Sequence, residues 1–284
     1  MPGRRLISEE AAERRGYGGR EPTRRGAVLR ETLDAFERAP ADHHHALART
    51  NLERWRRASS APEPAGEVVV RSDDWGVATL ALTRAHGRRF AVLNMANAYS
   101  PGGAYVEGTA AQEENMFRRT DCHFEIGPDE MDPATDRYLP AISALLSAAD
   151  GRVYLDTDRP RVCIRGPEER GRDDLGYAWL PDDEVFDFFE LRAAALDCRH
   201  ARFDAAEARR RIAAQLDTLV AAGARHAVLS AFGCGAFANP ASVVANIYRE
   251  ELDLRRADFA LVAFAIYDPG YGPDNHAPFA RAFA

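Results

Sequence analysis

Residues 90–115 read FAVLNMANAYSPGGAYVEGTAAQEEN, and this segment indicates how the chain folds. A hydrophobic run ends in an asparagine-rich turn, a Pro-Gly-Gly loop follows, and two adjacent glutamates open the next helix. Strands that helices cover on both faces read as continuous apolar runs, and parallel sheets bind ligands outside the carboxyl ends of their strands. The segment therefore predicts a buried parallel strand that leads into a ligand-binding loop.

The chain from residue 66 onward alternates between strand and helix patterns. A helix is predicted from about Asp204 to Ala222, because Asp204 precedes Glu207 by three residues, as in a capping box, and apolar residues form one stripe. A second helix is predicted to begin with Asn239 as its cap and Pro240 in its first turn. The predicted strands are Glu67–Arg71, Val77–Leu82, Phe90–Asn94, Val162–Arg165, Ala227–Ala231 and Ala260–Tyr267.

Charge and composition exclude several classes of function. The 284 residues carry a formal charge of -7, so they offer no bulk attraction to the phosphate backbone of nucleic acid. All 37 basic residues are arginines, which rules out a Walker-type phosphate loop and Schiff-base chemistry, because both need a lysine. Four widely spaced cysteines and the lack of a long apolar run indicate a soluble, cytoplasmic protein with no membrane association.

A second glycine-rich loop follows another predicted strand, at residues 229–240, LSAFGCGAFANP. Backbone N–H groups in such a turn can bind phosphate without a lysine. An isolated Gly-x-Gly is more often an ordinary tight turn, and a Glu-Glu pair more often complements a helix start. Taken together, however, the two loops predict a diphosphate held between two glycine turns with a carboxylate nearby.

Two other features have simpler interpretations. His43, His44 and His45 form a run in a polar helical segment, where histidines are more often solvated than metal-bound. Cys234 lies in the second glycine loop without a histidine or acid placed by motif to activate it, so we interpret it as a small residue lining the loop. We expect neither a metal nor a cofactor.

The sequence resembles the macrodomain fold, specifically the microbial type of poly(ADP-ribose) glycohydrolase. The signature of that family is a glycine triplet followed by Gln-Glu-Glu, and here Pro101-Gly102-Gly103-Ala104 precedes Gln112-Glu113-Glu114 and Arg118-Arg119-Thr120. Residues 233–240 are similar to the family's diphosphate loop, and Arg24-Arg25 with Glu31-Thr32-Leu33 to its helical lead-in. One departure is Ala104 in place of the third glycine, which adds a methyl group and restricts φ near the ligand.

The resemblance implies an α/β fold: a three-layer α/β/α macrodomain with a mixed, mostly parallel sheet and an N-terminal helical extension. We accordingly expect a helical extension over residues 1–65, packed on the core, and a catalytic domain over residues 66–284. The expected state is a monomer.

The resemblance also implies hydrolysis of the O-glycosidic linkage of poly(ADP-ribose) or of ADP-ribosylated acceptors, with release of ADP-ribose. Glu114 is the implied general acid and base, Glu113 the partner of the ribose hydroxyls, and Asn97 a contact of the ribose near the scissile bond. An early-turn glutamate favours its ionised form, so burial, Glu113 and the substrate's diphosphate would have to favour the neutral acid. The other implied substrate-binding residues are Gly102, Gly103, Ala104, Gln112, Gly233, Cys234, Gly235, Ala236 and Phe237.

Two alternatives stay open at this point. A macrodomain that binds ADP-ribose without cutting it would share the fold, because fold does not determine function. The Glu113-Glu114 pair favours the enzyme, since a pure reader does not need it. A third interpretation, suggested by the N-terminal segment, makes the chain a structural partner in a larger system.

Overall fold

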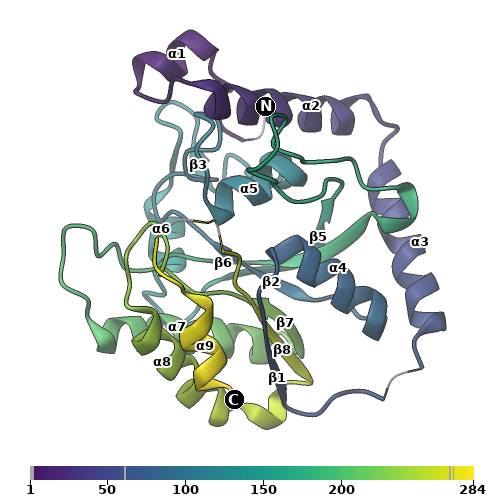
Figure 1. Cartoon of the computed structure of the whole chain (residues 1–284), viewed down its shortest axis with the longest axis vertical. Coiled ribbons are helices and arrows are strands. Elements are labelled where there is room, and N and C mark those ends of the chain that lie inside the picture. Colours follow the sequence, from purple (N-terminus) through teal and green to yellow (C-terminus); the bar gives the residue numbers. More distant parts are fainter. Residues whose placement is uncertain (1–2, 61, 269, 271) are drawn as a thin grey trace. The chain divides into compact units, whose positions relative to one another are not determined.

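The computed structural model describes residues 3–60, 62–268, 270 and 272–284 (Figure 1). The chain forms two compact units. The first comprises Met1–Asn51, Ala96–Ser143 and Arg161–Asp187, and the second comprises Leu52–Met95, Ala144–Pro160 and Phe188–Ala284. These boundaries differ from the one at residue 65 that the sequence indicates, because each unit draws on stretches far apart in the chain. The division into an extension and a catalytic domain stays a prediction.

A six-stranded sheet, most of which belongs to the second unit, has the strand order β1-β8-β7-β2-β6-β5. The neighbouring pairs from β1 to β6 are all parallel, with Glu67 opposite Leu261 and Ala91 opposite both Ala227 and Phe189. This confirms the predicted α/β fold with its mostly parallel sheet. The strands are β1 (Glu67–Arg71), β2 (Ala91–Met95), β5 (Tyr154–Cys163), β6 (Phe186–Ala193), β7 (His226–Leu229) and β8 (Leu261–Ala265), and a separate pair is formed by β3 (Met131–Asp132) and β4 (Arg137–Tyr138).

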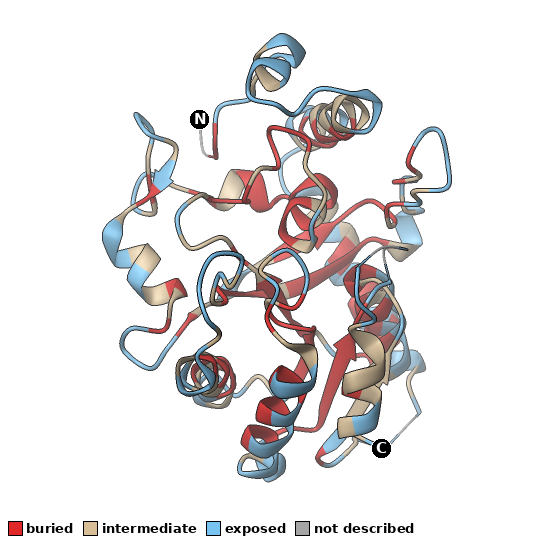
Figure 2. Ribbon diagram, turned by 60° about the vertical axis from the view of Figure 1, so that its left-hand side comes forward, coloured by how far each residue is buried: buried red, intermediate tan, exposed pale blue. Residues whose placement is uncertain are grey.

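The sheet in the second unit is buried on both faces. Successive side chains of a strand point to opposite faces, and on β6 both sets of side chains are packed against helices. On β6, Leu191 joins the core with Ile212 and Val244 of the helices α7 (Ala205–Ala221) and α8 (Ala241–Asp253). Phe188, three residues earlier, points the other way and packs edge-on against Trp75, with ring centroids 5.4 Å apart. Figure 2 shows the resulting concentration of buried residues on the strands. The expected α/β/α layering is therefore present.

The segment around Val77–Leu82 is a helix, and the predicted strand there is wrong. It belongs to α4 (Trp75–His86), whose first turn is capped by Asp74: the side chain accepts hydrogen bonds from the backbone N–H groups of Gly76 and Val77. Gly87, with φ 59°, ends the helix in the left-handed conformation. The remaining helices outside α7 and α8 are α1 (Glu9–Arg14), α2 (Arg20–Arg38), α3 (His43–Ala58), α5 (Gln112–Arg119), α6 (Pro140–Leu146) and α9 (His276–Ala282).

The helix α7 begins where the sequence predicts. Asp204 is its N-cap, and the carboxylate accepts hydrogen bonds from the N–H groups of Ala206, at 2.9 Å, and Glu207, at 3.1 Å. Such a cap satisfies two of the donors that a helix start leaves unpaired. In the described part of the chain, no helix combines the length and the apolar character needed to cross a bilayer.

Replacing Asp204 with alanine removes this cap. We expect Asp204→Ala to lower the free energy of unfolding by about 1 kcal/mol, measured by urea titration, because the two N–H groups lose their acceptor. The control is Asp204→Asn, whose side-chain oxygen can accept the same bonds, so its stability should stay near that of the wild type. Equal losses in both variants would contradict the capping role.

Candidate active site

A tight glycine turn follows the carboxyl end of β2, in the first unit. Gly102 and Gly103 have φ angles of 71° and 60°, which L side chains rarely adopt, and the Gly103 N–H donates to the Ser100 carbonyl at 3.0 Å. A Cβ atom on Gly103 would lie 2.4 Å from Oε1 of Glu114. Only glycine at this position leaves room for the carboxylate against the loop.

Glu114 lies in the first turn of α5 and is 9% exposed. Its Oε1 atom accepts hydrogen bonds from the Ala104 N–H, at 3.0 Å, and from the Thr109 hydroxyl, at 3.3 Å. Its Oε2 atom has no hydrogen-bond partner among the described residues. The carboxyl group is thus held through one oxygen while the other is available to a ligand.

Glu113, the preceding residue, is 3% exposed and accepts hydrogen bonds from backbone N–H groups of the loop. Its Oε2 accepts from the Asn97 N–H at 2.7 Å, and its Oε1 accepts from the Gly102 N–H at 3.1 Å. Asn97 in turn accepts, through Oδ1, from the N–H groups of Tyr99 and Ser100. Glu113 therefore fixes both the Asn97 turn and the glycine turn of the loop.

Thr109 and Gln112 have the sequence spacing of a capping box, which predicts that Thr109 caps α5, but this box is not formed. The N-cap of α5 is Ala111, which has no side chain able to cap, and Gln112 is the first residue of the helix. Thr109 instead donates to the Ala104 carbonyl, at 2.9 Å, and to Glu114. Ala104 has a negative φ, so the methyl group that replaces the family's third glycine causes no left-handed strain.

A buried network of hydrogen bonds and an ion pair stabilises α5. The sequence does not predict this network. Arg118, fully buried, donates to the Tyr177 hydroxyl at 3.2 Å and to the Thr109 carbonyl. Tyr177 donates to Glu168 at 2.6 Å, and Glu168 pairs with Arg25 at 2.7 Å. The motif includes both arginines, but Tyr177 lies 59 positions from Arg118 and Glu168 lies 143 positions from Arg25, so no local pattern identifies these two contacts.

The second glycine loop lies in the other unit, after the carboxyl end of β7. Gly233 has φ 73°, and a Cβ on it would lie 2.6 Å from Nδ2 of Asn239, which donates to the Gly233 carbonyl at 3.0 Å. The N–H groups of Gly235, Ala236 and Phe237 make no hydrogen bond within the described chain. Three adjacent donors, two of them on exposed residues, suit an anion.

The sequence predicts Asn239 as the cap of α8, but this prediction is wrong. The N-cap is Pro240 and the helix begins at Ala241. The Asn239 amide instead closes the loop, because it also donates to the Leu196 carbonyl at 2.7 Å and to that of Phe237 at 3.3 Å. Phe237 itself lies near Arg199, whose guanidinium carbon is 5.3 Å from the ring centroid.

Cys234 is 2% exposed, and burial raises the pKa of its thiol to about 12. Its Sγ atom lies 3.6 Å from the Phe232 carbonyl, to which it can donate. A thiol that stays protonated at neutral pH is a poor nucleophile, which agrees with its interpretation as a small residue lining the loop.

The predicted site residues thus form two groups. Asn97, Gly102, Gly103, Ala104, Gln112, Glu113 and Glu114 belong to the first unit, and Gly233 to Phe237 belong to the second. Both loops leave the sheet at the carboxyl ends of β2 and β7, which are parallel neighbours. Carboxyl ends of neighbouring parallel strands are the usual ligand-binding edge of a sheet.

The histidine run lies at the start of α3. His45 Nε2 lies 3.0 Å from an Asp121 carboxylate oxygen, and this hydrogen bond raises the pKa of His45. Burial lowers the pKa of His44. Over residues 3–60, 62–268, 270 and 272–284, no three His, Cys, Asp or Glu side chains are grouped so as to hold a metal ion.

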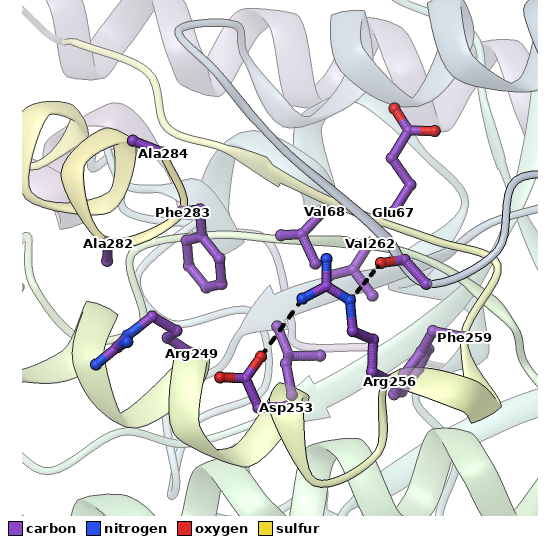
Figure 3. Close-up of a pocket in the computed structure, with 12 residues that line it drawn as sticks. Glu67, Val68, Arg249, Asp253, Arg256, Phe259, Val262, Ala282, Phe283 and Ala284 are labelled. Carbon is purple, nitrogen blue, oxygen red and sulfur yellow. Dashed lines mark hydrogen bonds and ion pairs between the residues drawn. The ribbon is translucent and has the colours of Figure 1, made fainter.

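A pocket of about 270 Å³ in the second unit lies at the amino ends of β1 and β8 (Figure 3). Arg256 crosses it, donating to the Gly66 carbonyl at 3.1 Å and pairing with Asp253 at 3.6 Å. The pocket is therefore at the opposite end of the strands from the second glycine loop, and we do not assign the reaction to it. Apolar residues that line it include Val68, Phe259, Val262 and Phe283.

Comparisons with known proteins point to one family. Residues 30–128 match the family model described as the microbial-type PARG catalytic domain. Among solved structures, the chain is similar to the poly(ADP-ribose) glycohydrolase (PARG) from Thermomonospora curvata, with 26% identity and a TM-score of 0.65 over 91% of this chain and 99% of that chain. The same enzyme bound to the inhibitor ADP-HPD gives 26% identity and a TM-score of 0.64 over the same shares.

The chain is also similar to the PARG from Deinococcus radiodurans in complex with ADP-ribose. That similarity has 25% identity and a TM-score of 0.54, and it covers 85% of this chain and 90% of that chain. A comparison with curated proteins finds no match.

The raised pKa of Cys234 predicts low reactivity. With a pKa near 12, about one thiol in ten thousand is ionised at pH 8, so iodoacetamide should leave Cys234 unmodified in the native protein. Peptide mass mapping would locate the label, with the less buried Cys198 as the internal comparison and urea-denatured protein as the positive control. If Cys234 in the native protein were labelled as fast as Cys198, its thiol would be neither buried nor protonated as described.

Proposed function

We propose that this chain, which belongs to the family of microbial-type poly(ADP-ribose) glycohydrolases, hydrolyses the O-glycosidic linkage of poly(ADP-ribose) or of ADP-ribosylated acceptors and releases ADP-ribose. The observation that carries the proposal is the state of Glu114: one oxygen is held by two donors and the other has no partner in the described chain. Glycoside cleavage needs such a positioned acid beside the sugar.

Glu114 is the general acid and base of this reaction. Because Oε1 already accepts two hydrogen bonds, the proton of the neutral acid resides on Oε2, which transfers it to the departing oxygen as the glycosidic bond breaks. The resulting carboxylate then takes a proton from the water that attacks the sugar carbon, which restores the acid. The transition state resembles an oxocarbenium ion, so negative charge nearby stabilises it.

Each of the two loops carries groups suited to a part of ADP-ribose. Glu113, beside Glu114, contacts the ribose hydroxyls, and Asn97 offers its side-chain N–H₂ to the ribose near the scissile bond. The N–H groups of Gly235, Ala236 and Phe237 bind the diphosphate, since they have no acceptor within the described chain. This use of backbone donors suits a protein that contains no lysine.

The proposal also covers the compartment, the oligomeric state and the partners of the protein. Its four cysteines, Cys122, Cys163, Cys198 and Cys234, are free thiols, as expected in the reducing cytoplasm. Its net charge of -7 argues against direct nucleic-acid binding. We propose a monomer whose partners are ADP-ribosylated proteins or polymer.

The alternative is a macrodomain that binds ADP-ribose without cutting it. The Glu114 geometry favours the enzyme, because a reader has no use for a buried carboxylate with one free oxygen. Incubation with polymer and, separately, with singly ADP-ribosylated protein, followed by chromatography for free ADP-ribose, separates the two. Binding of either substrate without release of ADP-ribose would overturn the enzyme and support the reader.

Substituting Glu114 tests the mechanism directly. We expect Glu114→Gln to lower kcat on polymer by about 10²- to 10⁴-fold, because glutamine keeps the acceptor for the Ala104 N–H but cannot transfer a proton. Binding of ADP-ribose, measured by calorimetry, should stay close to that of the wild type.

The matched control is Glu37→Gln, an exposed glutamate of α2, which should leave kcat unchanged. Near-normal turnover by the Glu114→Gln protein would remove Glu114 from the mechanism, whatever the control does.

A further inference from the structure

The first residues of the described chain pack against the loop between β2 and α5, residues 96–111, which we call the catalytic loop. The Gly3 N–H donates to the Ile126 carbonyl at 2.8 Å, and the Arg4 N–H donates to the Tyr105 hydroxyl at 3.2 Å. The Tyr105 hydroxyl also lies 2.7 Å from Nδ1 of His123. Arg4 is only 8% exposed, so this part of the chain is packed and not a free tail.

The buried Arg4 guanidinium contacts the catalytic loop at two places. Nη1 donates to the carbonyl oxygen of Gly103, and Nη2 donates to Oε1 of Glu107 at 2.8 Å. Glu107 is 6% exposed and follows Gly103 by four residues. A planar guanidinium held at one end by a carboxylate presents its other N–H groups in a fixed direction.

The Gly103 carbonyl and the Ala104 N–H belong to the same peptide unit. Peptide units are planar, so the two groups point in opposite directions and move together. On one side the carbonyl accepts from Arg4, and on the other side the N–H donates to Glu114 Oε1. Arg4 and Glu114 therefore hold a single rigid group from its two ends.

The peptide between Gly103 and Ala104 needs hydrogen bonds at both ends because the adjacent glycines do not restrict its rotation. Gly102 and Gly103 can adopt many backbone conformations, and a rotation of the peptide between Gly103 and Ala104 would withdraw the N–H from Glu114. The carboxyl would then lose a donor that fixes which oxygen faces the ligand. Hydrogen bonds at the two ends of one amide also strengthen one another.

We infer that Arg4 is a positioning residue of the hydrolysis: it holds the Gly103–Ala104 peptide so that the Ala104 N–H keeps Glu114 oriented toward the scissile bond. The inference rests on the proposed function, since it assigns a second residue to the same reaction. Arg4 lies outside residues 30–128, where the family model matches, so that match does not include it.

The surroundings of Arg4 provide a matched control. Arg15 also pairs with Glu107 Oε1, at 3.0 Å, but its side chain is 54% exposed. The Arg15 side chain donates a hydrogen bond to Glu107 Oε1, whereas the Gly103 carbonyl accepts from Arg4. Arg15→Ala removes one positive charge beside Glu107 without touching the peptide, whereas Arg4→Ala removes the hold on the peptide and leaves Glu107 paired with Arg15.

The experiment compares steady-state kinetics on polymer for the wild type, Arg4→Ala and Arg15→Ala, together with ADP-ribose affinity and thermal unfolding. We expect Arg4→Ala to lower kcat by about 10- to 100-fold, because small misplacements of a catalytic group cost this much. KM should stay within about threefold of the wild type, since the donors that bind the substrate remain. Arg15→Ala should keep the kcat of the wild type.

Two further measurements distinguish positioning from stability. Millimolar guanidinium, well below denaturing concentrations, should restore part of kcat in Arg4→Ala but not in Glu114→Gln, with sodium chloride as the control for ionic strength. Arg4→Lys keeps the charge but not the planar two-ended geometry, so it should lose at least about threefold in kcat at unchanged KM. Arg4→Lys also serves if Arg4→Ala fails to fold.

Several outcomes would overturn the inference. They are an Arg4→Ala or Arg4→Lys protein with the kcat of the wild type, an equal loss in Arg15→Ala, or a loss that appears as a rise in KM alone. An active wild type with unaffected Arg4 variants would sink the positioning role and leave the proposed function standing. A wild type that releases no ADP-ribose would sink both.

Discussion

The hydrogen bond from the Ala104 N–H to Glu114 Oε1 is the interaction on which the candidate site depends. It requires a carboxylate at the start of α5, a turn that brings the backbone to it, and two glycines with positive φ to make that turn. Gly103 has no room for a side chain because the carboxylate occupies the space. The loop, the helix start and the acid therefore form one unit, and none of the three has its observed geometry without the others.

Much of the fold could be predicted from the sequence because burial leaves a local pattern. The strand Glu67–Arg71 and the helix that starts after Asp204 are where periodicity and capping place them. The prediction of a strand at Val77–Leu82 is wrong, because a short apolar run does not distinguish a buried strand from a buried helix. The signals for a helix were present in Asp74 and Gly87, which cap its two ends, and they outweigh the apolar run.

The candidate site was predictable in its residue types and less so in its contacts. Glu113 and Glu114 lie in the first turn of α5, as expected. Thr109 and Asn239 do not have the roles that the sequence predicts. Their spacing predicts helix caps, but each side chain forms hydrogen bonds that stabilise a loop. Arg4 left no signal at all, since its partners lie 99 and 103 positions away and a charged residue near the start of a chain is usually solvated. Long-range contacts between buried polar groups have no sequence period.

The uneven occupancy of the Glu114 carboxyl has a consequence for inhibitor chemistry. With Oε1 already engaged by a main-chain amide and a threonine hydroxyl, the group offers a single anchoring point. When the carboxyl is ionised, its Oε2 atom can accept a charge-assisted bond from a compound that carries one well-aimed ammonium N–H. Forked amidines or guanidines, which seek both oxygens at once, would have to displace the backbone amide, so potency should favour monodentate cations.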